Sequence, residues 1–176
     1  MKDVSPAIFL VPIITLVIVV SLYRYLQQKA SNKVAFRRMI FNMIIIAFVL
    51  NWIWELLQGP LYRGFTFTLP HIAFCTLASV ADVTMVVFLY FIFAISRKNP
   101  FWIQRVNFIQ VIIIMIIGGI GATIAESLHT SAGNWVYSDK MPIIPMVKTG
   151  LSPVLQFFLL PVIIYSMSFS LLKNKM

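Results

Sequence analysis

Three acidic side chains lie inside long apolar stretches of this sequence. Glu55, Asp82 and Glu126 each interrupt such a stretch, whereas Asp3 and Asp139 lie outside them. A charged side chain at the centre of a bilayer costs at least about 2.5–3.5 kcal/mol, so acids within membrane spans usually face a protein interior and serve a function. We therefore predict that Glu55, Asp82 and Glu126 are catalytic, giving and taking protons. The alternative is that they are neutral groups whose hydrogen bonds hold helices together.

Further polar side chains recur on the helical faces that carry these acids. At about 100° per residue, Asp82 returns to within about 20° of the direction of His71, three turns away. Cys75 and Ser79 lie between them on the same face, which we expect to point into the bundle because lipid would penalise it. The candidate substrate-binding residues, which share this depth or the aromatic rim beside it, are Asn51, Trp54, Gln58, Tyr62, His71, Cys75, Trp135, Tyr137, Ser152 and Gln156.

Metal binding is only weakly indicated. Several of these residues, among them His71, Cys75 and Asp82, are of the types that bind zinc. The sequence has no His-Glu-x-x-His or paired-cysteine motif, and its single cysteine excludes an intrachain disulfide. A nucleophile elbow is also missing. We predict neither a metal site nor a cofactor.

Membrane-spanning helices must position these residues. Of the 176 residues, 60% are hydrophobic and only 11% are charged, and a soluble fold of this size could not bury so much apolar surface. One span needs about 20 mostly apolar residues. We expect the first span to be retained rather than cleaved as a signal peptide. The sequence therefore predicts an all-α integral membrane protein of one domain, 1–176, with five transmembrane helices at about 6–25, 39–58, 70–95, 106–128 and 150–172.

Basic residues are distributed unevenly between the two sides of the membrane. The connections and the chain terminus on one side contain ten Lys and Arg, and those on the other side contain four. Cytoplasmic loops concentrate Lys and Arg, so we predict an outside N-terminus and a cytoplasmic C-terminus. The same placement explains the net charge of +9 without a nucleic-acid partner, because the charges lie between the spans rather than along one helix. Membrane lipids are the partners we expect for these charges.

Two segments near the fourth span predict special backbone arrangements. The small residues of 118–122 should allow a neighbouring helix to pack closely. The outer loop, 129–149, contains Pro142 and Pro145, which exclude a regular helix there. This loop is either a lid over the polar site or a stiff connector at the membrane surface. His129, at its start, is expected to face water.

Several short motifs occur from the second to the fifth span. They are Asn51-x-x-Trp54-Glu55, Pro60-Leu61-Tyr62, Cys75, Asp82, Glu126, Trp135-x-Tyr137-Ser138-x-x-Met141-Pro142-x-x-Pro145 and Gly150-Leu151-Ser152-Pro153-x-x-Gln156. With these residues, the sequence resembles an uncharacterised family of small bacterial five-helix membrane proteins. That resemblance implies a bacterial cytoplasmic membrane but supplies no activity. A membrane glutamate followed by an aromatic-x-Tyr and a proline-rich segment is also similar in layout to carotenoid hydratases, polytopic enzymes that add water across an isoprenoid double bond.

Three functions remain open on the sequence. The first, which we favour, is a membrane enzyme that acts on a lipid or isoprenoid by carboxylate acid–base chemistry. The second is a small-solute or proton-coupled carrier in which Asp82 titrates in the middle of the membrane. The third is a non-catalytic assembly subunit whose polar faces lock helices together. The first two require an apolar small molecule or a transported solute as partner, and the sequence leaves a homo-oligomer open.

Overall fold

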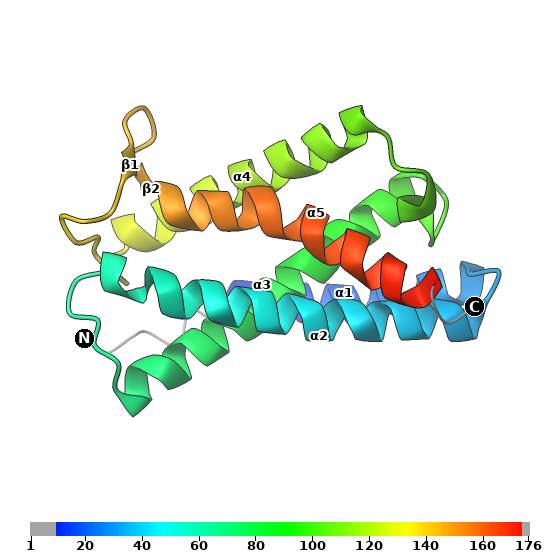
Figure 1. The fold of residues 1–176 in the computed structure, drawn as a ribbon, viewed down its shortest axis with the longest axis horizontal. Helices are drawn as coiled ribbons and strands as arrows, with labels where there is room; N and C mark the ends of the chain where they lie inside the picture. The colour runs from blue at the N-terminus through cyan, green and yellow to red at the C-terminus, as the bar shows by residue number, and fades with distance from the viewer. Residues whose placement is uncertain (1–9, 174–176) are drawn as a thin grey trace.

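The computed structural model describes residues 10–173, which fold almost entirely into helices. Each of the five long helices is long and apolar enough to cross a membrane. Successive helices run in opposite directions, so their connections gather at the two ends of an elongated bundle (Figure 1). The five are α1 (Leu10–Lys29), α2 (Lys33–Gln58), α3 (Leu69–Ser96), α4 (Phe108–Ser131) and α5 (Leu151–Lys173).

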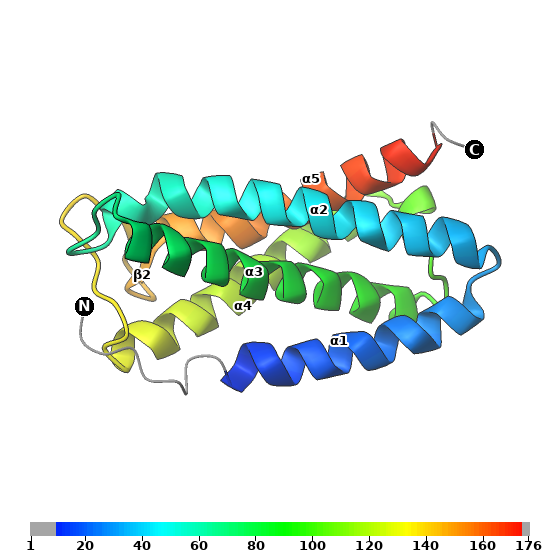
Figure 2. The ribbon, with the colours of Figure 1, turned by 90° about the horizontal axis from the view of Figure 1, so that it is seen from below.

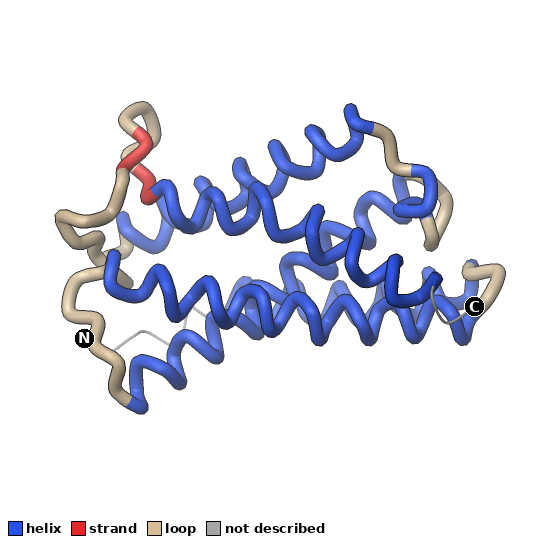
Figure 3. The backbone as a smooth tube through the Cα atoms, viewed as in Figure 1, coloured by secondary structure: helices blue, strands red, loops and turns tan. Residues whose placement is uncertain are grey.

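The two ends of the bundle have different connections. One end carries the 3-10 helix η2 (Gly59–Leu61) and the strands β1 (Ile143–Ile144) and β2 (Thr149–Gly150), which pair antiparallel (Figure 3). We call it the strand end. The other end carries the turn between α1 and α2 and the 3-10 helix η3 (Trp102–Arg105). We call it the basic end, because most of the chain's Lys and Arg lie there.

The packing order in space differs from the order in the sequence. α4 packs on α5, α5 on α2, α2 on α3, and α3 on α1. Figure 2 shows α3 lying between α1 and α2. Within residues 10–173, α4 makes extensive contacts with one other helix, α5. The helices therefore follow one another as an open arc rather than as a closed ring.

The outer surface of the arc is apolar. In α1, only Thr15, Val19 and Leu26 are buried, and in α4 the side chains of Ile116 and Ile120 are about half exposed. Covering such a surface with water would be unfavourable, so lipid must cover it. The prediction of an all-α bundle with five helices able to span a membrane is confirmed.

The helix boundaries follow local capping more closely than hydropathy. The second helix begins at Lys33, six residues before the predicted span, because the Asn32 side chain accepts a hydrogen bond from the Ala35 N–H (2.9 Å). α4 begins with a capping box, in which Asn107 and Gln110 each bond the backbone N–H of the other. The other predicted spans end within a few residues of the observed helices, and 6–9 of the first one lie outside the described residues.

Aromatic side chains fill the bundle toward the basic end. The rings of Tyr90, Trp102 and Tyr165 pack together, with centroids 5.2 Å apart for Tyr90 with each of the other two. All three are almost fully buried. Each polar atom has a partner: the Tyr90 hydroxyl donates to the Pro100 carbonyl (2.8 Å) and the Tyr165 hydroxyl to the Val86 carbonyl (2.7 Å). The Trp102 indole N–H donates to the Tyr90 carbonyl (3.2 Å). These three rings form a tightly packed layer.

Gly118 permits the close contact of α4 with α5 that the sequence predicted. A Cβ atom at Gly118 would overlap the backbone oxygen of Phe157, whereas one at Gly121 would meet open space. We expect Gly118→Ala to lower the free energy of unfolding by about 1–3 kcal/mol, because the helices must move apart. Gly121→Ala is the matched control, and better helix propensity should leave it neutral or up to about 1 kcal/mol more stable. Thermal unfolding in detergent measures both, and equal transition temperatures would contradict the close contact.

Candidate functional site

Gln156 of α5 lies at the centre of a hydrogen-bond network that joins three helices. Its side chain is only 2% exposed. Its Nε2 donates to Asp82 Oδ2 on α3 (3.0 Å) and to Asn51 Oδ1 on α2 (2.9 Å). Its Oε1 accepts a bond from Gln58 Nε2 (3.1 Å). Residues far apart in the sequence thus meet on one amide, which holds the Asp82 carboxyl against α2 and α5.

Gln58 extends this network to the second carboxyl. Its Nε2 also donates to Glu55 Oε1 (2.6 Å), and its Oε1 accepts from the Ser152 hydroxyl (2.9 Å). The Asn51 amide keeps its orientation because its Nδ2 donates to the Ala47 carbonyl (2.8 Å). The two glutamines are therefore a bridge with a carboxyl at each end, Glu55 on α2 and Asp82 on α3.

Glu126 of α4 is held by the loop that follows α4. Its side chain is buried, and its Oε2 accepts hydrogen bonds from Trp135 Nε1 (3.2 Å) and from the Tyr137 hydroxyl. The His129 ring stacks on Trp135, with centroids 4.5 Å apart, and its Nδ1 lies 2.8 Å from Asn134 Nδ2. His129 is half-buried behind Trp135, so only part of its ring can face water as expected. It supports the ring that donates to Glu126.

The loop after α4 is also attached to the segment after α2. Tyr62 and Tyr137 pair in an antiparallel bridge, which two backbone hydrogen bonds of 2.8 Å flank. Arg63 forms an ion pair with Asp139 (3.4 Å) at the surface, where both side chains are exposed. Such a pair adds little stability, so the backbone bridge is the main attachment. It holds the loop over Glu126.

Tyr62 lies next to the aromatic residues that hold Glu126. Its ring centroid is 5.6 Å from that of Tyr137. Burial, followed by the charges of Glu126 and Glu55 and to a smaller extent those of Tyr137 and Asp82, raises the pKa of Tyr62 above its ordinary value. The phenol therefore stays protonated at neutral pH and can donate a hydrogen bond. The charges of all three carboxyls thus act on one phenol, so we treat the two groups of acids as neighbouring parts of one candidate site.

In each of the three carboxyls, one oxygen accepts no hydrogen bond of good geometry. Within residues 10–173, this holds for Glu55 Oε2, Asp82 Oδ1 and Glu126 Oε1. None of these oxygens is completely enclosed by protein atoms, although the Glu55 and Asp82 side chains are mostly buried. A sealed polar group without a hydrogen bond would cost roughly 2–7 kcal/mol. Three open oxygens at one site can instead meet water or a polar group of a ligand.

His71 is not brought to this site, although its spacing placed it on the face of Asp82. Its Nδ1 lies 2.9 Å from the carbonyl of Thr66, and its ring stacks on Phe65 with centroids 5.4 Å apart. The loop before α3 thus captures the His71 side chain in the first turn of the helix. Spacing along a helix gives a direction but does not show which neighbours a terminal residue meets.

Cys75 and Trp54 lie near the site but contact other groups. Cys75 is buried, and its Sγ lies 3.9 Å from the Glu55 carbonyl oxygen, where α2 and α3 touch. Trp54 packs against the apolar core. Its Nε1 is the one buried side-chain nitrogen or oxygen without a partner among residues 10–173. Both residues therefore lie near the acids, in the regions where the helices pack against one another.

The chemistry of the site depends on carboxyl, amide and phenol groups. In the part of the chain that the structure describes, no three His, Cys, Asp or Glu side chains are arranged to hold a metal ion. Carboxyls and phenols transfer protons, and amides orient them. No family model, curated protein or solved structure matches this chain. Its function has to be inferred from the geometry of the site.

Proposed function

We propose that this protein is a multi-pass membrane enzyme that transfers protons to and from a lipid or isoprenoid substrate. The observation that supports it best is the placement of three carboxyls from three helices toward one end of the bundle: amides join Glu55 to Asp82, and Tyr137, whose ring packs on Tyr62, bonds Glu126. General acid–base catalysis needs one group that gives a proton and one that accepts it, and typically contributes about 10²–10⁴-fold to the rate. Three carboxyls from three helices can supply both groups.

The surroundings of the carboxyls favour an amphiphilic substrate. The rings of Tyr62, Trp135 and Tyr137 lie beside Glu126, at the end of apolar spans where aromatic residues commonly meet lipid headgroups. α4 contacts the rest of the bundle chiefly through α5, and Asp82 on α3 keeps partial exposure. A lipid could approach sideways from the membrane, with its polar or unsaturated part at the carboxyls.

The tightly packed layer toward the basic end favours an enzyme over a carrier. The polar network ends at Asp82, and the next residues on the inward face of α3 are Val86, Tyr90 and Phe91, each at most 1% exposed. A solute that passed from Asp82 to the basic end would have to displace this packed layer. An enzyme needs access from one side alone.

Comparison of membrane lipids tests this function directly. Lipid extracts from cells that produce the wild-type protein should contain a species that is missing, or much reduced, in cells without it. Cells that produce an equal amount of Glu126→Gln protein should match the cells without the protein. Extracts that do not differ between wild-type and empty cells would contradict an enzymatic role on lipids.

We also propose that the strand end faces outward and the basic end faces the cytoplasm, in a bacterial inner membrane, because basic residues concentrate at one end. Single cysteines in a Cys75→Ser background test the orientation. Ser131 and Ser96 are exposed and lie at opposite ends of the bundle. A membrane-impermeant thiol reagent added to intact cells should label Ser131→Cys but not Ser96→Cys. The reverse labelling would contradict the orientation.

A further inference from the structure

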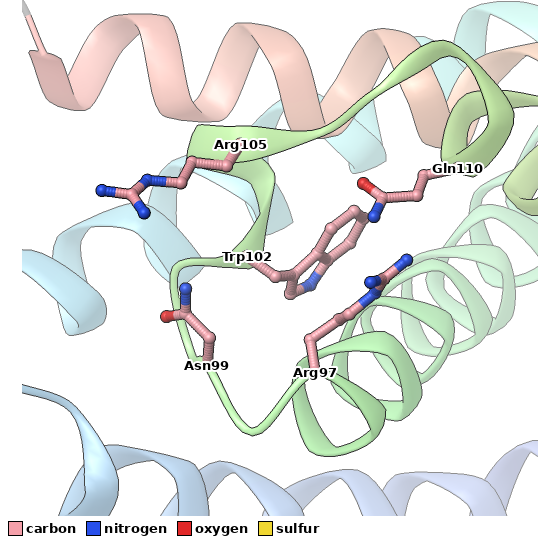
Figure 4. A pocket seen from close by; sticks show the side chains of 5 residues that line it. All are labelled: Arg97, Asn99, Trp102, Arg105 and Gln110. Atoms are coloured by element: carbon pink, nitrogen blue, oxygen red, sulfur yellow. The ribbon is translucent and has the colours of Figure 1, made fainter.

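A polar cavity lies at the basic end of the bundle, opposite the carboxyls. Its volume is about 170 Å³, and it is formed by the end of α3, by η3 and by the first turn of α4. Figure 4 shows the side chains that line it, which are Arg97, Asn99, Trp102, Arg105 and Gln110. The lining contains two cations and no acid.

The amide groups of this cavity present donors, because local hydrogen bonds use their acceptors. Asn99 Oδ1 accepts a bond from the Phe101 N–H (2.9 Å), and Gln110 Oε1 accepts one from the Asn107 N–H (3.1 Å). The Gln110 side chain is only 9% exposed, and its Nε2 has no partner within residues 10–173. In Figure 4 its amide points toward Trp102 and Arg97. The amide that is most buried here thus directs an unused N–H group into the cavity.

The two arginines of the cavity lack an acidic partner in the described chain. Among residues 10–173, the one ion pair is that of Arg63 with Asp139, at the strand end. No Asp or Glu occurs in the sequence between Asp82 and Glu126, which includes the whole basic connection. Arg97 and Arg105 are both exposed. Guanidinium groups bind phosphate oxygens with paired, charge-assisted hydrogen bonds.

We propose that this cavity binds the phosphate group of an anionic ligand, and that a membrane phospholipid is the source of that phosphate. Most of the hydrogen-bonding groups left unused in the cavity are donors, since each amide oxygen already accepts a bond, and this suits a phosphate better than a cation. Large apolar side chains continue from the cavity along the membrane-facing surface: Phe108 is 77% exposed and Ile109 66%. Acyl chains can cover these residues while the headgroup occupies the cavity. Basic pockets between transmembrane helices are known sites for anionic headgroups.

Binding of defined lipids to the purified full-length protein tests the proposal. Native mass spectrometry in detergent compares dioleoylphosphatidylglycerol with dioleoylglycerol, which has the same chains but no phosphate. Wild-type protein should bind the phospholipid at least about tenfold more tightly than dioleoylglycerol. The double variant Arg97→Gln, Arg105→Gln should lose this preference. The matched control, Arg24→Gln with Arg37→Gln, removes two exposed cations from the same end outside the cavity and should keep it.

A second pair of substitutions separates the cavity from general charge. Asn99→Asp and Gln110→Glu keep the oxygens that accept from Phe101 and Asn107, so the local fold should be preserved. They replace the donating NH₂ groups by negative charge, so phospholipid binding should fall at least as far as in the arginine variant. Unchanged preference for the phospholipid in either double variant, or equal loss in the Arg24, Arg37 control, would overturn the proposal.

The source of the phosphate is decided by competition. Millimolar inorganic phosphate should not displace dioleoylphosphatidylglycerol, because the acyl chains add contacts on α4 that the free ion cannot make. If phosphate displaces the phospholipid from wild-type protein but not from the Arg97, Arg105 variant, the result supports the phosphate site with a soluble anion as its ligand. Displacement that is equal in both proteins would place the lipid outside the cavity and overturn the proposal.

Discussion

Replacement of Glu126 by Gln is expected to lower turnover of the lipid substrate by about 10²–10⁴-fold, the usual contribution of a proton-transferring group. Glutamine has the same size, and its carbonyl oxygen can still accept the bonds from Trp135 and Tyr137. It cannot exchange a proton with a substrate. The measurement is the rate at which protein in lipid nanodiscs converts the species found by the lipid comparison. The thermal unfolding temperature should stay near that of the wild type.

Asp139→Asn is the matched control for loss of a carboxyl at the same end. The Asp139 side chain is 97% exposed and contacts the Arg63 guanidinium at the surface, so turnover should not change. A further comparison, Tyr137→Phe, keeps the ring and removes one donor from Glu126, so an intermediate loss of turnover is expected. Wild-type turnover in Glu126→Gln would contradict the catalytic role. A lowered unfolding temperature with unchanged turnover would instead indicate that Glu126 holds helices together.

The spans could be predicted because their signal is long and local. Twenty or so apolar residues cannot be mistaken for a soluble element, and four charged connections separate the five runs. The first residue of α2 could not be predicted in this way. Lys33 and the polar residues after it belong to the helix but not to its hydrocarbon-spanning part. Hydropathy detects the thickness of the membrane, whereas the Asn32 cap determines where the helix begins.

The sequence predicts which residues belong to the site, but not which hydrogen bonds join them. The spacing of Asn51, Glu55 and Gln58 indicates a shared helical face, yet nothing local shows that Gln58 bonds Gln156, 98 residues away. That pairing results from the packing of α2 on α5, which depends on the whole fold. The position of Tyr62 beside Tyr137 is non-local in the same way, because an antiparallel bridge between the two residues produces it.

The sequence alone does not reveal two features, the cavity at the basic end and the stacking of His129 on Trp135. In both cases a general property of the residue type already explains the residue, so no specific contact is expected. The basic residues Arg97 and Arg105 were explained by membrane orientation, which is a property of charge alone. Their cavity becomes visible only when η3 brings Trp102 between them and Gln110 turns its amide toward it (Figure 4). His129 lies near a helix end, which predicts a side chain that faces water. The loop that follows folds back, however, and its Trp135 stacks on the His129 ring. Long-range folding of short loops is beyond periodicity arguments.

Replacement of Gln156 by Met is expected to destabilise the bundle by roughly 2–5 kcal/mol, the cost of two buried acceptors left without partners. Methionine is unbranched and fills a similar volume, so packing of α5 changes little. Asn51, 1% exposed, loses the bond to its Oδ1, and Asp82 loses the bond to its Oδ2. Interhelical hydrogen bonds in membranes average only about 0.6 kcal/mol, because separated helices find other partners. That average makes the lower part of the range the more realistic one.

Thermal or denaturant-induced unfolding in detergent measures the loss, and Ser152→Ala is the control. Ser152 is half-buried and donates one bond to Gln58, so its loss should cost less than about 1 kcal/mol. If Gln156→Met unfolds like the wild type, apolar packing alone joins α2, α3 and α5, and the amides have no structural role. If Gln156→Met unfolds earlier while Glu126→Gln does not, the two residues have different tasks. Gln156 then positions the carboxyls of the other helices, and Glu126 is free to react.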